Sequence, residues 1–340
     1  MPRPVQNPPN PWSSTQVEWL EEPPNATLQV FEERARSILS ENDSPDLPFR
    51  YSVNPYRGCI HACAYCYARP SHQYLGFGAG TDFDRKIVVK TNAPELLREA
   101  FVRPSWKGDD VVFSGNTDCY QALEANYEIT RRCLEVCLEF QNPISIITKS
   151  RLVARDASLL AELSRRARAM VFLSIPFARD EDARKIEPWA ATTTLRFSAM
   201  RILADAGIPV GIAIAPVIPG LNDPDVPELL ERAREAGATV AFTQPLRLAA
   251  EVLPVFEERL EDAYPLRVNK VKNAIIEMRG GKMNESAFGA RFSGQGPRWA
   301  MIERLFEAHC ARLGLNKERI TTGGPTTFRR PEKQLSLFDK

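Results

Sequence analysis

Residues 54–69 read Asn-Pro-Tyr-Arg-Gly-Cys-Ile-His-Ala-Cys-Ala-Tyr-Cys-Tyr-Ala-Arg and contain a C-x3-C-x2-C triplet, Cys59, Cys63 and Cys66. One disulfide cannot pair three thiols, and an odd total of seven cysteines does not indicate a disulfide framework. Thiolates at this spacing are ligands for zinc or for an iron–sulfur cluster. Structural zinc sites and electron-carrying clusters use four protein ligands. A triplet without an obvious fourth ligand therefore predicts a cubane cluster with one iron open to a substrate.

A zinc knuckle is the alternative interpretation of the triplet. His61 or His72 would then supply the fourth ligand. The alternating strands and helices predicted for the rest of the chain favour the cluster.

The triplet also carries a family resemblance. Cys59, Cys63, Tyr65 and Cys66 match the C-x3-C-x-aromatic-C signature, and the chain resembles the radical S-adenosylmethionine (SAM) superfamily. The residues that flank the signature resemble the branch that includes spore photoproduct lyase. These flanking residues are Arg57-Gly58 and Tyr67-Ala68-Arg69.

The resemblance implies a cofactor set and a chemistry. Cys59, Cys63 and Cys66 would hold a [4Fe–4S] cluster whose fourth iron is chelated by the amino and carboxylate groups of SAM. One-electron reduction would cleave SAM to methionine and a 5′-deoxyadenosyl radical, which abstracts a substrate hydrogen atom. The electron would come from a donor such as flavodoxin or ferredoxin.

Composition sets limits on partners and compartment. The chain has 340 residues, 44% of them apolar, and is nearly neutral, with 44 basic and 43 acidic residues. No overall field points to nucleic acid, so such a contact needs a local patch. No secretion signal is visible, and the longest apolar run, residues 210–221, is too short to span a bilayer. We expect a cytoplasmic protein without a membrane partner.

Short apolar segments alternate with helical segments between residues 49 and 245. The predicted strands are 49–53, 87–89, 110–113, 144–147, 171–175, 209–215 and 239–242, and the predicted helices are 95–102, 123–140, 156–169, 194–206 and 226–236. This pattern predicts an α/β fold of about six parallel βαβ units. The resemblance implies a partial (β/α)6 TIM-type barrel, although the pattern alone does not exclude a doubly wound sheet.

The remaining segments flank this core, which we assign to residues 49–245. Residues 1–48 are a proline-rich extension with a short predicted helix at 28–39. Residues 246–320 form a helical C-terminal region, and residues 321–340 are expected to be a flexible tail. The helices of the C-terminal region are predicted at 255–263, 265–279 and 298–313.

Polar residues follow the predicted strand at 110–113. In α/β barrels ligands bind at the C-terminal ends of the strands. The resemblance implies that this turn binds the SAM amino group. An ordinary turn in which Asp118 caps the next helix is the alternative. The turn residues in question are Ser114, Gly115, Asn116 and Asp118.

Three later strand ends complete the expected SAM site. The resemblance implies that Lys149 contacts the SAM carboxylate, although a surface lysine is an equally valid interpretation. Ser174 is predicted to contact the ribose, and Pro216-Val217-Ile218 to line the adenine. Asn222 and Asp223 beyond it are alternatively helix caps. The backbone of Tyr65 would face the adenine edge.

The other cysteines have different interpretations. Cys119 follows the Asp118 turn, and spore photoproduct lyase uses a cysteine on this strand end as a hydrogen-atom donor. In that enzyme the cysteine precedes the aspartate, which weakens the assignment of Cys119 as a donor. Cys133 and Cys137 lie on one helix face and predict core packing, and Cys310 is expected to be structural.

The C-terminus holds a partner motif. Gln334, Leu335, Leu337 and Phe338 belong to Gln-Leu-Ser-Leu-Phe, which resembles the pentapeptide that binds the bacterial DNA sliding clamp. A tail folded back on its own protein is the alternative. A clamp partner would place the enzyme at DNA, and a candidate DNA surface, or alternatively a loop over the barrel mouth, surrounds Arg291, Arg298 and Trp299.

The sequence therefore predicts a radical SAM enzyme that acts on DNA in a repair-like reaction. Two alternatives stay open. The first is a non-catalytic iron–sulfur or zinc protein that associates with the clamp as a binding module. The second is a radical SAM enzyme with a protein or small-molecule substrate.

Overall fold

The main sheet decides the architecture of the protein. The computed structural model describes residues 27–317 and 326–331, and within them this sheet has the strand order β10-β9-β8-β7-β6-β3-β2. Its strands are Leu39–Glu41 (β2), Tyr51–Val53 (β3), Val111–Phe113 (β6), Ile144–Thr148 (β7), Ala169–Ser174 (β8), Val210–Val217 (β9) and Val240–Pro245 (β10). Strands β3 to β10 of this sheet pair in parallel, and β2 pairs antiparallel with β3.

Strand order separates the two architectures that the sequence leaves open. Each parallel strand of the main sheet lies beside the next one along the chain. A doubly wound sheet reverses this order at a switch point, whereas a TIM-type barrel keeps it. The structure therefore confirms the predicted partial (β/α)6 barrel.

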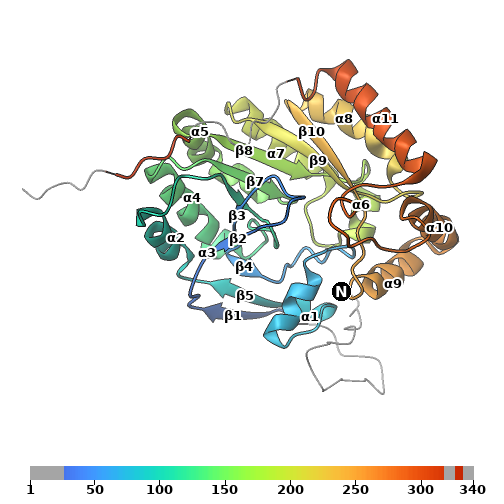
Figure 1. The fold of residues 1–340 in the computed structure, drawn as a ribbon, viewed down its shortest axis with the longest axis horizontal. Coiled ribbons are helices and arrows are strands. Elements are labelled where there is room, and N and C mark those ends of the chain that lie inside the picture. The colour runs from blue at the N-terminus through green and yellow to red at the C-terminus, as the bar shows by residue number, and fades with distance from the viewer. Residues whose placement is uncertain (1–26, 318–325, 332–340) are drawn as a thin grey trace, which may run out of the picture.

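Helices line the outside of the curved sheet, as Figure 1 shows. They are Ala93–Val102 (α2), Glu124–Tyr127 (α3), Ile129–Glu139 (α4), Ala157–Arg166 (α5), Asp180–Ile186 (α6), Thr193–Asp205 (α7) and Val226–Glu235 (α8), with Thr81–Arg85 (α1) beside the cysteine loop. Helix α2 contacts α4, α4 contacts α5, α5 contacts α7, and α7 contacts α8. Their apolar faces and the buried strands form the main hydrophobic core.

The predicted helix at residues 28–39 is wrong. Gln29–Glu33 forms strand β1 and pairs in parallel with Lys86–Lys90 (β5), which pairs antiparallel with Tyr56–Arg57 (β4). Val30 and the residue after it have high strand propensity, but the partner β5 decides the outcome, and it lies far away in sequence. The described part of the predicted extension is thus built into both sheets.

The predicted helix at residues 123–140 is divided at Glu128, whose φ is 50°. The buried Glu124 carboxylate accepts hydrogen bonds from the backbone N–H groups of Thr130 and Arg131 at 3.0 and 3.1 Å. The first N–H groups of a helix lack partners within it, so Glu124 caps α4 from the preceding turn. Apolar periodicity alone does not show such a break.

The C-terminal region is helical, as predicted. Its helices are Leu253–Ala263 (α9), Val268–Met278 (α10) and Gly296–Leu313 (α11). Helix α11 packs on α8 and on α10, as can be followed in Figure 1. Within the described residues, no helix has the length and apolar character needed to cross a membrane.

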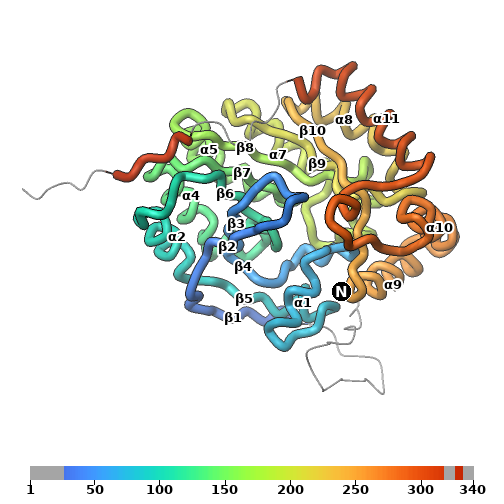
Figure 2. The backbone as a smooth tube through the Cα atoms, viewed as in Figure 1, coloured from blue at the N-terminus to red at the C-terminus, as the bar shows by residue number. Residues whose placement is uncertain are grey.

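Part of the predicted flexible tail is ordered. The Phe328 ring lies 6.0 Å from the rings of Phe101 and Phe140, and the backbone N–H of Arg329 donates to the Phe140 carbonyl at 2.8 Å. Thr326 donates to the Gly108 carbonyl at 2.6 Å. This segment, red beside α4 and α5 in Figure 2, is the tail anchor, residues 326–331. The predicted clamp motif at 334–338 lies outside the described residues.

Candidate functional site

The cysteine loop follows β4 and is fixed from two sides. The backbone N–H of Cys59 donates to the Phe83 carbonyl at 3.0 Å. The Arg69 guanidinium donates to the Cys63 carbonyl from Nε at 3.2 Å and from an Nη at 2.9 Å. Its charge is balanced by Asp84, at 3.0 Å. The loop conformation is therefore set by the chain itself.

The donor set of the loop fits an iron–sulfur cluster. Cys59, Cys63 and Cys66 are free thiols. Burial raises the pKa of each of them, so a bound cation must offset the cost of the thiolate charge. Among the described residues, no three His, Cys, Asp or Glu side chains are gathered around a position for one metal ion. A cluster presents a separate iron to each thiolate and does not require that gathering.

The histidines considered as zinc ligands have other surroundings. The Nδ1 atom of His61 lies 3.4 Å from the Asp118 carboxylate. His72 is buried with its ring against Phe77 and Phe83, and burial lowers its pKa to about 4. Neither histidine belongs to a group of three described His, Cys, Asp or Glu side chains that could hold one metal ion, so the structure gives the zinc alternative no support.

Asp118 is fully engaged within the protein. One carboxylate oxygen accepts hydrogen bonds from the Thr148 hydroxyl and the Tyr120 N–H, at 2.8 and 2.9 Å. The other accepts from the Lys149 N–H at 2.8 Å and faces His61. Although burial alone would raise it, these partners hold the pKa of Asp118 at about 2. Asp118 thereby fixes the positions of Thr148, Lys149 and His61 at the strand ends.

Lys149 lies where the sequence predicts, at the end of β7. Its ammonium donates to the Ser174 hydroxyl at 3.0 Å, and Ser174 donates to the Ala215 carbonyl at 3.1 Å. The ammonium lies 3.9 Å from the Glu187 carboxylate and 5.6 Å from the centre of the Tyr65 ring. The structure thus brings together three predicted residues from β7, β8 and the cysteine loop.

Glu187 and Arg196 complete this polar cluster and were not predicted from the sequence. Both side chains are 0% exposed and form an ion pair at 2.5 Å. Glu187 also accepts a short hydrogen bond from the Tyr65 hydroxyl. Glu187 lies at the end of α6 and Arg196 lies in α7, and neither belongs to a recognisable sequence motif. The fold brings them beside the cysteine loop.

The predicted adenine residues are divided between two cores. Val217 is buried in the main core, whereas Ile218 is buried in a second cluster with Cys63 and Tyr65. Asn222 holds this turn, since its side-chain oxygen accepts from the Ile218 N–H at 2.6 Å and its amide donates to the Pro216 carbonyl at 3.0 Å. Asn222 thus braces the turn by two contacts.

The turn after β6 contacts the cysteine loop. Ser114 has a φ of 69°, and its hydroxyl accepts from the Cys119 N–H at 2.8 Å. The Gly115 carbonyl accepts from the Tyr67 hydroxyl at 2.8 Å. Asn116 donates from its side chain to Ser71 at 3.2 Å. This turn is therefore held beside the loop, in the position expected for a cofactor contact.

Cys119 is fully buried in the main core, together with Cys133. Its carbonyl accepts a hydrogen bond from Thr130 at 2.6 Å. This position gives no support to a hydrogen-donor role. Cys133 and Cys137 pack in the core, and Cys310 is buried on α11, in line with the predicted structural roles.

The three predicted DNA residues do not form one surface. Arg291 pairs with Asp46 at 2.7 Å, and Arg298 pairs with Glu277 at 3.0 Å. Trp299 is only 3% exposed, so its ring is not available for base stacking. The prediction for Trp299 is therefore corrected: the residue belongs to the core beneath α11.

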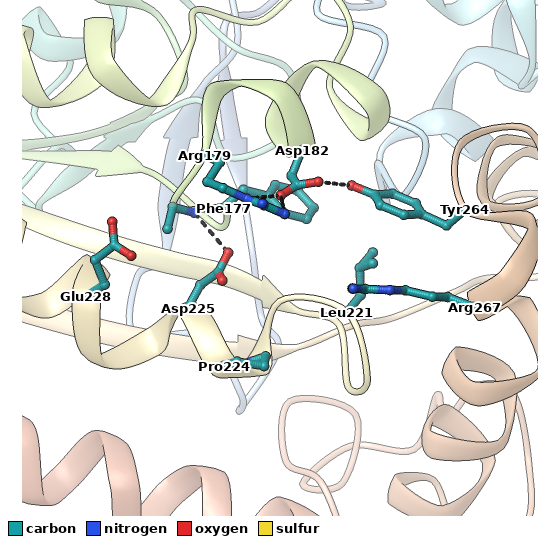
Figure 3. A pocket seen from close by; sticks show the side chains of 10 residues that line it. Phe177, Arg179, Asp182, Leu221, Pro224, Asp225, Glu228, Tyr264 and Arg267 are labelled. Carbon is teal, nitrogen blue, oxygen red and sulfur yellow. Dashed lines mark hydrogen bonds and ion pairs between the residues drawn. The ribbon is translucent and has the colours of Figure 1, made fainter.

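A separate pocket of about 220 Å³ lies outside this site, between the β8–α6 connection, α8 and α9. Figure 3 shows that its polar groups face one another: Asp182 bonds to Arg179 and Tyr264, and Asp225 accepts from the Ala178 backbone at 2.9 Å. None of the predicted site residues lines this pocket.

The fold and site define a partial α/β barrel with a buried three-cysteine loop below a polar cluster. Residues 53–233 match the model of the radical SAM superfamily, more than half of the chain, and the protein belongs to this superfamily. It is a radical SAM enzyme, a class that uses a [4Fe–4S] cluster and SAM.

Relatives agree with this assignment. An uncharacterized protein of Mycobacterium tuberculosis is 38% identical over 228 residues, 66% of this chain and 67% of the relative. A radical SAM Nalpha-GlyT isomerase of Pseudomonas phage M6 is 25% identical over 233 residues, 67% of this chain and 46% of the isomerase.

A solved structure has the same fold. Spore photoproduct lyase complexed with dinucleoside spore photoproduct has a TM-score of 0.60 at 16% identity, covering 84% of this chain and 80% of the lyase chain. At this identity the likeness concerns the fold.

Proposed function

We propose that this radical SAM enzyme acts on DNA in a repair-like reaction, with Cys59, Cys63 and Cys66 as the cluster ligands. The observation that carries the site assignment is the polar cluster directly beside the cysteine loop, in which Lys149 lies near the Tyr65 ring. When bound, the cluster supplies the electron that cleaves SAM and generates the 5′-deoxyadenosyl radical.

The chain's own residues bind and orient SAM in this proposal. Lys149 attracts the SAM carboxylate, because its hydrogen-bond partner is the neutral Ser174 hydroxyl, and the more distant Glu187 carboxylate is shared with Arg196. Ser114, Gly115 and Asn116 supply contacts for the amino group. Ser174 and the turn at 216–218 receive the ribose and adenine.

A nucleic-acid substrate is supported by the spore photoproduct lyase structure, which holds a dinucleoside lesion in a fold shared over most of this chain. A sliding-clamp partner is supported by the Gln-Leu-Ser-Leu-Phe motif at residues 334–338. Flavodoxin or ferredoxin is the proposed class of electron donor, and the proposed compartment is the cytoplasm.

Anaerobic reconstitution with iron and sulfide, followed by dithionite and SAM, tests the chemistry. We expect 5′-deoxyadenosine from the wild type and none from Cys63→Ala. Cys137→Ala is the matched control, because it removes a buried thiol of the α4 core and should leave the product intact. A wild type that binds iron but forms no 5′-deoxyadenosine would contradict the site assignment.

The substrate is tested in the same assay. UV-irradiated DNA should change the rate of 5′-deoxyadenosine formation relative to unirradiated DNA of the same sequence. Equal rates with irradiated, unirradiated and no DNA would remove the DNA assignment and leave the radical chemistry standing.

A further inference from the structure

Arg247 belongs to the segment after β10 and lies near the end of the cysteine loop, at Tyr67. Its neighbours Leu246 and Leu248 are buried in the same apolar cluster as Cys63 and Tyr65. The guanidinium itself is close enough to the Tyr67 side chain to interact with it electrostatically. The guanidinium that follows β10 therefore lies at the C-terminal end of the barrel strands, where ligands bind in this type of fold.

Arg247 has no ion-pair partner of its own among the described residues, because Asp46, the carboxylate that acts on it, is paired with Arg291. Arg247 forms no hydrogen bond with the described residues, and its Nε atom is inaccessible and without a partner. Burial and the neighbouring Arg291 lower its pKa. A half-buried guanidinium without an ion-pair partner lowers the stability of the protein, and a bound anion would offset this loss.

The surroundings add positive charge rather than neutralise it. Arg279 is 3% exposed and donates only to backbone carbonyls in the described structure, those of Ser293, Pro245 and Leu246. Burial, and then the charge of Arg247, lower the pKa of Arg279 to about 10. Arg291 is the exception, because Asp46 balances it.

Aromatic rings accompany these cations. The Arg247 guanidinium lies 4.7 Å from the centre of the Phe292 ring, and Arg291 lies 4.9 Å from the same ring. Tyr67, next to Cys66, is 55% exposed, and Phe288 is 65% exposed. An unpaired arginine among exposed rings suits a phosphate with its attached base, since single-stranded nucleic acid is bound by charge and stacking together.

We propose that Arg247, held on the Phe292 ring beside Tyr67, binds a backbone phosphate of the nucleic-acid substrate and places an unstacked nucleotide over the cysteine loop. This inference rests on the proposed function and names the part of the substrate that the barrel mouth recognises. A carboxylate of a protein substrate is the competing occupant.

The test is fluorescence anisotropy with a short labelled oligothymidylate, titrated at several salt concentrations. Arg247→Gln should weaken binding about tenfold and reduce the slope of log affinity against log salt by about 0.7, the value for one phosphate contact on a single strand. Arg166→Gln is the matched control, because it removes an equal charge from an exposed residue of α5 that is paired with Glu162. It should leave both quantities unchanged. Iron content and melting temperature verify that both variants are folded.

The outcomes separate this inference from the proposed function. If the wild type binds and Arg247→Gln binds equally well with the same slope, the Arg247 site is refuted while a DNA substrate stands. A wild type that binds no oligonucleotide overturns both. If an oligoglutamate peptide of equal charge displaces the oligonucleotide equally well, the nucleic-acid assignment of the site is overturned in favour of an acidic peptide.

Discussion

Glu187 determines the charge balance of the polar cluster at the strand ends. It is inaccessible to solvent and interacts with Arg196, Lys149 and the Tyr65 hydroxyl. A charge in such a position is tolerated only when it is paired and hydrogen-bonded. Because Glu187 is shared in this way, Lys149 is only partly neutralised.

Replacing Glu187 by Gln should destabilise the protein. The substitution keeps the shape of the side chain but leaves Arg196 buried without a counter-charge, at a cost of about 3–5 kcal/mol. The midpoint of urea unfolding measures the loss. Glu181→Gln, in α6 and in an exposed pair with Lys185, is the control and should leave the midpoint almost unchanged. Equal midpoints for the two variants would refute the role given to the buried pair.

At the scale of elements, the positions of the strands could be predicted, but their partners could not always be. Continuous apolar segments such as Val111–Phe113 identify parallel strands because both faces are buried. The prediction of a helix in place of strand β1 was wrong because the strand is stabilised by its pairing with β5. The break between α3 and α4 was not predicted because it depends on a buried carboxylate, Glu124, which caps the second helix.

The same division between local signals and long-range contacts applies to the candidate site. The cysteine triplet and Lys149 could be found because spacing and strand ends carry a local signal. Glu187, Arg196 and Arg247 could not, since each depends on contacts between segments far apart in sequence. Trp299 was misjudged for a related reason: sequence adjacency to a site does not reveal which way a side chain is buried.

The turn before the first cysteine gives a prediction at this scale. Gly58 has a φ of 77°, and a Cβ there would lie 2.8 Å from the Phe83 carbonyl oxygen and 2.9 Å from Ile87. The same carbonyl accepts the Cys59 N–H, so Gly58→Ala should displace Cys59. We expect reconstituted iron per chain to fall by at least half.

Gly76→Ala is the control for this substitution. Its φ is 75°, yet a Cβ there would meet nothing within 4 Å. It should cost about 1–2 kcal/mol of stability from the left-handed backbone and keep its iron. Full iron loading in Gly58→Ala would show that the loop tolerates a shift of Cys59.

At the scale of the whole molecule, the site and the tail anchor lie at opposite ends of the strands of the main sheet. The site residues follow the C-terminal ends of β6 to β10, whereas the tail anchor contacts Gly108 and Gln141, which precede β6 and β7. The tail anchor therefore lies on the side of the molecule away from the barrel mouth. That arrangement leaves the mouth free for a substrate.

Two phenylalanines of the tail should separate anchoring from partner binding. Phe328→Ala removes a ring that packs against Phe101 and Phe140, which should cost about 2 kcal/mol and lower the melting temperature by about 3 °C. It should leave capture by an immobilised sliding clamp intact, because the motif at 334–338 remains. Phe338→Ala should have the opposite pattern, with an unchanged melting temperature and lost capture.

Two truncations make the same separation without point substitutions. A chain that ends at residue 331 keeps the tail anchor and should melt with the full chain, while a chain that ends at 325 should melt lower; neither should be captured by the clamp. If Phe338→Ala is captured as well as the wild type, the clamp partner is excluded. If the two truncated chains have the same melting temperature, residues 326–331 contribute no stability. The tail anchor would then not hold the chain on the side of the molecule away from the site.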